Sequence, residues 1–211
     1  MADAKICGVV DAATVDAAIT GGARFIGMVR YPKSPRHVGL DAAAALAARA
    51  RGRVDVVVLT VDAPDSELDD IARVVRPDWI QAHGRESPPR TAALRRFACK
   101  GVIKAIGLAH ATDLTQAEAY APAADMLLFD AKPPAGGLPG GNALAFDWKI
   151  LAGQRISRPW MLAGGLSPAN VAEAIRLSGA GLVDVSSGVE AAPGLKDPAL
   201  IAQFLAAARS I

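Results

Sequence analysis

The sequence predicts a single α/β domain over residues 1–211, a closed (β/α)8 barrel of the TIM type. Three observations predict it. Eight short apolar runs suit buried parallel strands, alanine-rich segments of helical character separate them, and 211 residues suit one core better than two ordinary domains. Alternating strands and helices imply a parallel sheet, and eight units imply that it closes. The alternative is an open doubly wound sheet, but the glycine-rich fingerprint expected after its first strand is missing.

The expected strands are short and apolar, and they cover residues 5–9, 24–29, 54–60, 79–83, 101–107, 126–131, 160–165 and 182–187. The expected helices include residues 11–22, 40–51, 66–75, 167–179 and 197–210. Segment 167–179 opens with Ser167 as a cap and Pro168 at the first helical position, and it closes on Gly179. Two long loops, 30–40 and 131–146, each follow a strand, on the face where such barrels carry out chemistry.

Composition excludes several classes of protein. The formal net charge is +2, from 23 Lys and Arg against 21 Asp and Glu, and the basic residues do not form one block, so no nucleic-acid partner is expected. No window approaches the roughly 18 consecutive apolar residues of a membrane helix. The N-terminus has no signal-peptide pattern and the two cysteines have no zinc-site spacing, so we expect a cytoplasmic, reduced protein.

Several polar residues occupy expected strands at positions that would face the barrel interior near its mouth. Alternate strand residues point to the same side, and the set is Lys5, Cys7, Gln81, His83, Lys104, Asp130, Asp184 and Ser186. Buried polar groups cost free energy unless they are paired, so such a set at the ends of different strands indicates a site. Alternatively, Lys5 and Lys104 form structural ion pairs with Asp184 or Asp130.

The candidate acid/base pair is Cys7 and Asp130, at the carboxyl ends of the first and sixth strands. A lone cysteine is more often an inert small hydrophobic residue. Lys5, however, lies two residues away on the same side, where a cation favours the thiolate, and Gly8 lets a ligand approach the backbone. Asp130 ends its strand beside a long loop rich in Gly and Pro. Cys99 lies in a basic helical segment and is interpreted as packing.

Two glycine-bearing turns are typical of phosphate sites. AGGLSPAN (163–170) leads from the seventh strand into a helix, and DVSSGVE (184–190) leaves the eighth strand. Backbone N–H groups at such turns bind anions, and barrels commonly hold phosphate on these two loops. In the loop 31–37, Arg36 lies near prolines that stiffen the chain, and its planar fork suits a carboxylate group of the substrate.

Motifs spread over nearly the whole chain extend these observations. They are KICG (5–8), PKSPR (32–36), QAHG (81–84), ESP (86–88), VIKA (102–105), LLFDAK (127–132), GLPGG (137–141), FDW (146–148), LAGGLSPANVAEAI (162–175), DVSSGVE (184–190) and KDP (196–198). In this order the set resembles the phosphoribosylanthranilate isomerase family of tryptophan biosynthesis.

The resemblance implies an Amadori rearrangement without cofactor or metal. N-(5-phosphoribosyl)anthranilate, a phosphorylated aminosugar, becomes 1-(2-carboxyphenylamino)-1-deoxyribulose 5-phosphate. It implies that Asp130 is the general acid, Cys7 the general base and Arg36 the ligand of the anthranilate carboxylate. The expected substrate-binding residues are completed by Gly164, Gly165, Ser186, Ser187 and Gly188 for the phosphate, together with His83 and Asp184. A monomer or a homodimer is expected.

The sequence departs from the family pattern at Val9 and Val10, in the loop 137–146, and at Arg30, where an apolar residue is usual. These departures affect the loop contacts around the ring and the phosphate, and therefore efficiency rather than reaction type. Separately, three alternatives stay open. A related sugar-phosphate isomerase would use two aspartates, a pentose-phosphate epimerase would hold a metal with His and Asp, and a barrel kept as a scaffold would bind phosphate without catalysis. The presence of both Cys7 and Asp130 argues against the scaffold.

Overall fold

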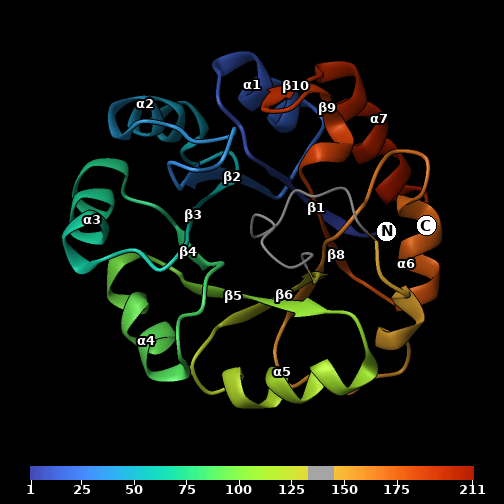
Figure 1. Ribbon diagram of the computed structural model, residues 1–211. Coiled ribbons are helices and arrows are strands. Elements are labelled where there is room, and N and C mark those ends of the chain that lie inside the picture. The colour runs from blue at the N-terminus through green and yellow to red at the C-terminus, as the bar shows by residue number, and fades with distance from the viewer. Residues whose placement is uncertain (133–144) are drawn as a thin grey trace.

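The computed structural model describes residues 1–132 and 145–211, and it is a closed barrel of eight parallel strands inside a ring of helices (Figure 1). The strands run in chain order around the barrel: β1 (Asp3–Cys7), β2 (Phe25–Arg30), β3 (Asp55–Thr60), β4 (Trp79–Ala82), β5 (Gly101–Leu108), β6 (Met126–Ala131), β7 (Trp160–Leu162) and β8 (Leu182–Val185). β1 pairs with β8 as well as β2, which closes the sheet. The predicted fold class is confirmed.

The helices follow the strands: α1 (Ala12–Thr20), α2 (Leu40–Ala50), α3 (Asp65–Asp70), α4 (Pro88–Ala93), α5 (Thr115–Tyr120), α6 (Val171–Ser178) and α7 (Pro198–Arg209). Short helical turns extend or replace them: η1 (Ile71–Val75), η2 (Leu94–Phe97), η3 (Ala111–Leu114), η4 (Trp148–Leu151) and η5 (Ser187–Val189). Between β6 and β7, the described residues form the single turn η4. No helix that the structure describes has the length and apolar character needed to span a membrane.

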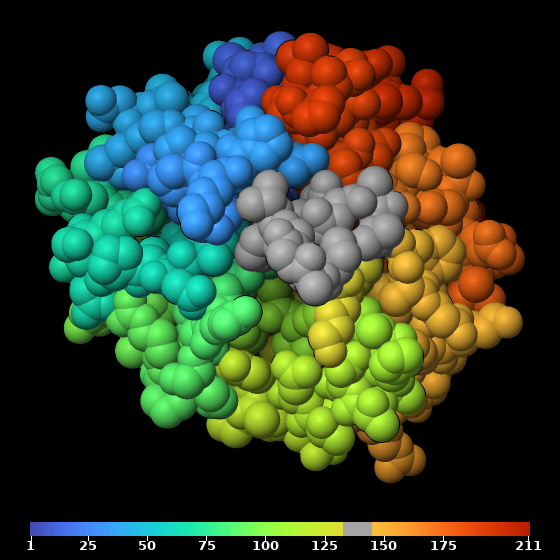
Figure 2. Space-filling model, in the orientation of Figure 1, coloured from blue at the N-terminus to red at the C-terminus, as the bar shows by residue number. Residues whose placement is uncertain are grey.

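Chain order is also spatial order around the barrel, as the colour sequence on the surface shows (Figure 2). The first helix and the last one meet, because α1 packs against α7. Both begin with an aspartate cap: Asp11 accepts from the N–H of Thr14 at 2.7 Å, and Asp197 accepts from that of Ala199 at 2.7 Å.

One predicted helix start is wrong. Ser167 does not cap α6, which begins at Val171 after Asn170. The cause is the Asn170 side chain, whose oxygen accepts from the N–H of Ser167 at 2.8 Å while its nitrogen donates to the carbonyl of Gly165 at 2.9 Å. These bonds hold residues 167–170 as a turn before the helix. The predicted end is confirmed, because Gly179 adopts a left-handed φ of 75° there.

A short antiparallel hairpin follows β8 and was not predicted. It consists of β9 (Glu190–Ala192) and β10 (Leu195–Lys196). It packs against the loop after β2 so closely that a methyl group on Gly194 would lie 2.5 Å from the carbonyl oxygen of Pro35. The hairpin therefore brings Glu190 and Lys196 to the same rim of the barrel as the loop 31–37.

The strand alternation sorts the core into two layers, as predicted. Side chains inside the barrel form one cluster of Phe25, Val57, Ile103, Met126, Leu128, Met161, Ala163 and Leu182. The alternate positions, such as Leu127 and Phe129, pack outward against the helices. This phase places Cys7, Lys5, Gln81, Asp130 and Asp184 on the interior side of their strands.

Lys104 corrects one of these expectations, because it faces the helix layer rather than the barrel interior. Its neighbour Ile103 belongs to the interior cluster and its neighbour Ala105 packs against that cluster, so the alternation turns Lys104 outward. There its Nζ donates to Glu86 Oε2 at 2.7 Å and to the carbonyl of Gly84 at 2.8 Å. Both side chains of this ion pair are only 3 % exposed. Glu86 also accepts from the N–H of Asp62 at 2.9 Å, so the pair fixes the loops after β3 and β4.

Arg30, the unusual residue at the end of β2, also faces outward. Its guanidinium donates to the carbonyl of Val38 at 2.7 Å and to Glu67 of α3 at 3.2 Å. The charge thus ties the long loop 30–40 to the neighbouring helix, which explains how the strand accommodates it.

The Lys104–Glu86 pair gives a stability prediction. Glu86→Gln leaves the buried ammonium of Lys104 without its counter-charge, and we expect the free energy of unfolding to fall by about 3–5 kcal/mol. The double variant K104M/E86Q removes both charges and should recover most of that loss. Urea unfolding of the three proteins measures both effects, and a loss below about 1 kcal/mol for Glu86→Gln would contradict the assignment.

Candidate active site

The floor of the site is an ion pair between the first and last strands of the barrel. Lys5 Nζ donates to Asp184 Oδ1 at 2.9 Å, and the lysine side chain is completely buried. The two residues are register partners in the β1–β8 ladder. Gly27 of β2 leaves room for this pair, because a methyl group there would lie 3.1 Å from both Lys5 Nζ and Cys7 Sγ. The structural alternative for Lys5 is therefore confirmed.

Cys7 ends β1 beside this pair, and its thiol is buried. Burial raises the pKa of the thiol above its ordinary value. The cations Lys5 and Lys196 act in the opposite direction, and the nearby Asp184 carboxylate adds to the increase. Lys5 favours the thiolate, as predicted, but the effect of burial on the pKa of the thiol is larger.

Asp130 lies at the end of β6, where two contacts orient its carboxylate. Oδ1 accepts from the backbone N–H of Ala131 at 2.8 Å, and Oδ2 lies 3.5 Å from Nε2 of His83. Gly164 lies against this group: a methyl group there would be 3.1 Å from Asp130 Oδ1 and 2.7 Å from the nitrogen of Ala131. With a φ of +86°, Gly164 is needed both for its backbone conformation and for its small size.

Arg36 holds a carboxylate that belongs to the protein. Its Nε and Nη2 donate to the two oxygens of Glu190 at 2.7 and 2.8 Å, a bidentate pair in which both side chains are nearly buried. Lys196 donates to the same carboxylate at 2.6 Å and also to the carbonyl of Ser186 at 3.0 Å. Burial alone would raise the pKa of Glu190, but the hydrogen bonds from Arg36 and Lys196 outweigh it and hold the pKa below its usual value.

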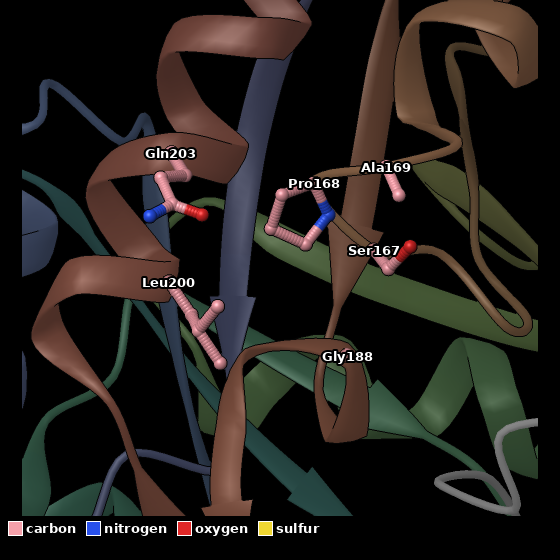
Figure 3. Close-up of a pocket in the computed structure, with 6 residues that line it drawn as sticks. All are labelled: Ser167, Pro168, Ala169, Gly188, Leu200 and Gln203. Atoms are coloured by element: carbon pink, nitrogen blue, oxygen red, sulfur yellow. The ribbon is translucent and has the colours of Figure 1, made fainter.

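The two glycine-bearing turns lie side by side. A methyl group on Gly188 would clash with the carbonyl oxygen of Leu166, so the turn after β8 touches the turn after β7. Gly165 adopts a left-handed φ of +63°. A pocket of about 530 Å³ lies between these turns and α7, lined by Ser167, Pro168, Ala169, Gly188, Leu200 and Gln203 (Figure 3). Cys7 and Asp130 do not line it, so it adjoins the turns and is separate from the acid/base pair.

Barrel order places the turns between the two reactive side chains. From β6 with Asp130, the barrel continues through β7 and β8 to β1 with Cys7. The turns at Gly164–Gly165 and Ser186–Gly188 therefore follow the two strands that separate the strand of Asp130 from the strand of Cys7. Among the described residues, no group of three His, Cys, Asp or Glu side chains is arranged to hold a metal ion.

Sequence comparison gives a family for this geometry. A family model described as N-(5'phosphoribosyl)anthranilate (PRA) isomerase matches residues 4–207. An N-(5'-phosphoribosyl)anthranilate isomerase of Paramagnetospirillum magneticum is 53 % identical over 208 residues, which cover 98 % of this chain and 97 % of the relative. The enzyme of a Caulobacter species is 50 % identical over the whole of both chains.

The chain belongs to the PRA isomerase family. Solved structures agree. The phosphoribosyl anthranilate isomerase of Thermotoga maritima superposes with a TM-score of 0.89 at 32 % identity, with both chains fully covered. A second structure superposes with a TM-score of 0.87 at 31 % identity. It is a phosphoribosyl anthranilate isomerase in complex with reduced 1-(o-carboxyphenylamino)-1-deoxyribulose 5-phosphate. The family resemblance drawn from the sequence motifs is confirmed.

In this member of the PRA isomerase family, the structure brings together most of the residues that the sequence analysis selected. It also shows partner residues that the sequence analysis did not select. Sequence reasoning missed the partners Glu190, Lys196, Glu86 and Asn170. All four lie within the motifs ESP, DVSSGVE, KDP and LAGGLSPANVAEAI, but the spacing of these motifs gives no sign that Glu190 would reach Arg36 across 154 positions. The loop motif GLPGG (137–141) lies outside the described residues.

The burial of Cys7 predicts that its thiol loses its proton at a higher pH than an ordinary thiol. In a Cys99→Ser background, the ultraviolet absorbance of the thiolate should rise only above the pH range of an ordinary thiol, because burial disfavours the charge. Asp184→Asn should move that rise to lower pH, since a carboxylate that opposes the thiolate is removed and Lys5 is left to favour it. An unchanged titration in Asp184→Asn would contradict this account of the thiol.

Proposed function

We propose that the chain converts N-(5'-phosphoribosyl)anthranilate into 1-(2-carboxyphenylamino)-1-deoxyribulose 5-phosphate, with Asp130 as general acid and Cys7 as general base. One observation carries the assignment of roles. The two groups end β6 and β1, and the strands between them bear the two glycine turns. A phosphate held on those turns would lie between an acid and a base, which is what a sugar phosphate needs for proton transfer at two positions.

The steps follow from these positions. Asp130 gives a proton to the ring oxygen of the furanose, the bond between that oxygen and C1 breaks, and C1 becomes part of an iminium ion. The iminium makes the proton on C2 acidic, and Cys7 removes it. The resulting enolamine becomes the ketone when C1 gains a proton and the C2 hydroxyl loses one. The substrate therefore needs a proton donor and a proton acceptor at different atoms.

The high pKa of the resting thiol fits this order of events. A buried thiol gives up its proton more readily when a positive charge lies beside it. The iminium supplies such a charge after Asp130 has acted. The thiol then releases its own proton to solvent at the barrel mouth, and the thiolate takes up the proton from C2. In this proposal the base becomes effective only after ring opening, so Cys7 does not carry a buried negative charge while the site is empty.

The binding roles are proposed on the same basis. Gly164, Gly165, Ser186, Ser187 and Gly188 would hold the phosphate through backbone N–H groups of the adjoining turns. Arg36 would bind the anthranilate carboxylate. Its guanidinium would either bind this carboxylate and Glu190 together or leave Glu190 for the substrate. Asp184 and His83 would act on the substrate through the groups that they contact, Lys5 and Asp130.

We also propose a cytoplasmic monomer or homodimer. A Thermotoga maritima relative, 30 % identical over the full length of both chains, is described as a dimeric isomerase from which monomers were generated.

The reaction is tested by following the fluorescence of freshly generated phosphoribosylanthranilate with the purified protein. The wild type should consume it faster than spontaneous decay. Cys7→Ser and Asp130→Asn should each lower kcat by on the order of 100-fold to 10,000-fold, because each removes one of the two proton-transfer groups. Cys99→Ser, the matched cysteine control, should keep full activity and circular dichroism should show all variants folded. Wild-type rates from either active-site variant would defeat the assignment.

Arg36 gives a prediction about substrate binding. Arg36→Met should raise KM by on the order of 10-fold to 100-fold with a smaller change in kcat, because a charge-assisted pair with the substrate carboxylate is lost. The control is a substrate made with aniline in place of anthranilate, which lacks that carboxylate. The penalty of Arg36→Met should be absent with this substrate, and an equal penalty on both would show that Arg36 acts only by holding Glu190.

A further inference from the structure

We propose that His83 stores the proton that Asp130 delivers, and that the amide of Gln81 supports the ring in both of its states. The inference deepens the proposed function and rests on Asp130 being the general acid. It assigns His83 a positioning and proton-supplying role that acts through Asp130, without contact to the reacting atoms.

The three side chains form a line across the ends of β4 and β6. Gln81 Nε2 lies 2.9 Å from Nδ1 of His83, and Nε2 of the ring lies 3.5 Å from Asp130 Oδ2. Gln81 is fully buried, and the side chains of His83 and Asp130 are 9 % and 14 % exposed. Both ring nitrogens of His83 therefore face a protein partner, and one of these partners is the proposed acid.

The buried oxygen of Gln81 indicates that the amide can change its partner within this line of side chains. Gln81 Oε1 has no hydrogen-bond partner among the described residues, although a buried acceptor without a partner costs free energy. Rotating the amide by half a turn brings Oε1 to Nδ1 of the ring. In the rotated orientation the amide accepts from Nδ1–H, which the imidazolium and the neutral ring left after proton delivery both carry, so Gln81 can serve both states.

Proton delivery then follows in one balanced step. In the loaded state, the imidazolium of His83 has Nδ1–H on Gln81 Oε1 and Nε2–H on the carboxylate of Asp130. The Nε2–H bond breaks and an O–H bond forms at Oδ2, which leaves a neutral ring with its remaining proton on Nδ1. Asp130 now carries the proton that the furanose oxygen takes, and solvent reloads the ring after turnover.

The surrounding charges leave His83 as the proton source. Among the described ionisable side chains, His83 is the one whose nitrogen lies within 4.0 Å of the Asp130 carboxylate. On β1 and β8, Lys5 is paired with Asp184, and Cys7 is the proposed base. On β5, Lys104 is turned outward to Glu86. From β7, the residue against Asp130 is Gly164, which has no side chain.

His83→Gln is the decisive variant, because its amide N–H can replace Nε2–H as a donor to Asp130 but cannot carry a mobile proton. We expect kcat to fall by on the order of 10-fold to 100-fold with KM changed by less than about 3-fold. The alkaline limb of the kcat profile should move to lower pH, because the deliverable proton can then reside only on a carboxyl group, and a carboxylic acid is a stronger acid than an imidazolium. His110→Gln, which replaces an exposed histidine, is the matched control and should leave both unchanged.

The ring itself can be observed without turnover. Nitrogen-15 NMR of the His83 ring in the wild type should show conversion between the neutral and imidazolium forms, and Asp130→Asn should shift that conversion to lower pH. The proposal would be overturned if His83→Gln kept the wild-type kcat and pH profile. It would also be overturned if the ring signal of His83 converted at the same pH in Asp130→Asn as in the wild type. A wild type without isomerase activity would defeat the proposed function instead, because the NMR titration does not depend on it.

Discussion

The ion pair between Lys5 and Asp184 is the constraint on which the site depends. It joins β1 to β8, the two strands whose pairing closes the barrel, and it is buried where the mouth begins. A lysine that is completely buried requires a counter-charge, so the seam can form in only one register. That register fixes the height of Cys7 above the interior cluster, and Gly27 on β2 leaves the space that the pair and the thiol occupy.

The rest of the rim is organised by charges held in the same manner. Arg36, Glu190 and Lys196 join the loop after β2 to the hairpin after β8, and Lys104 with Glu86 holds the loops after β3 and β4. Each group is paired before any substrate arrives. A resting thiol with a raised pKa belongs to the same arrangement.

The position of the two glycine-bearing turns relative to Asp130 and Cys7 follows from the strand order. Because β7 and β8 separate β6 from β1, any ligand anchored on their turns lies between Asp130 and Cys7 without a special adaptation of either strand. The turns are themselves fixed by non-local contacts, with Asn170 bonded back to Gly165 and Gly188 against Leu166. Glycine at 164 and 188 is therefore required as much by close packing as by backbone freedom.

The sequence by itself determined the barrel, the interior placement of Cys7, Asp130 and Asp184, and the family. Strand periodicity and ordered motifs are local properties of the chain, so they can be recognised without the fold. The tertiary structure decided the partners. Glu190 reaches Arg36, Glu86 reaches Lys104, and His83 reaches Asp130, each by a contact between different segments of the chain. Lys104 shows the physical reason: a shift of one residue in strand phase reverses the side that a charge faces, and only packing fixes that phase.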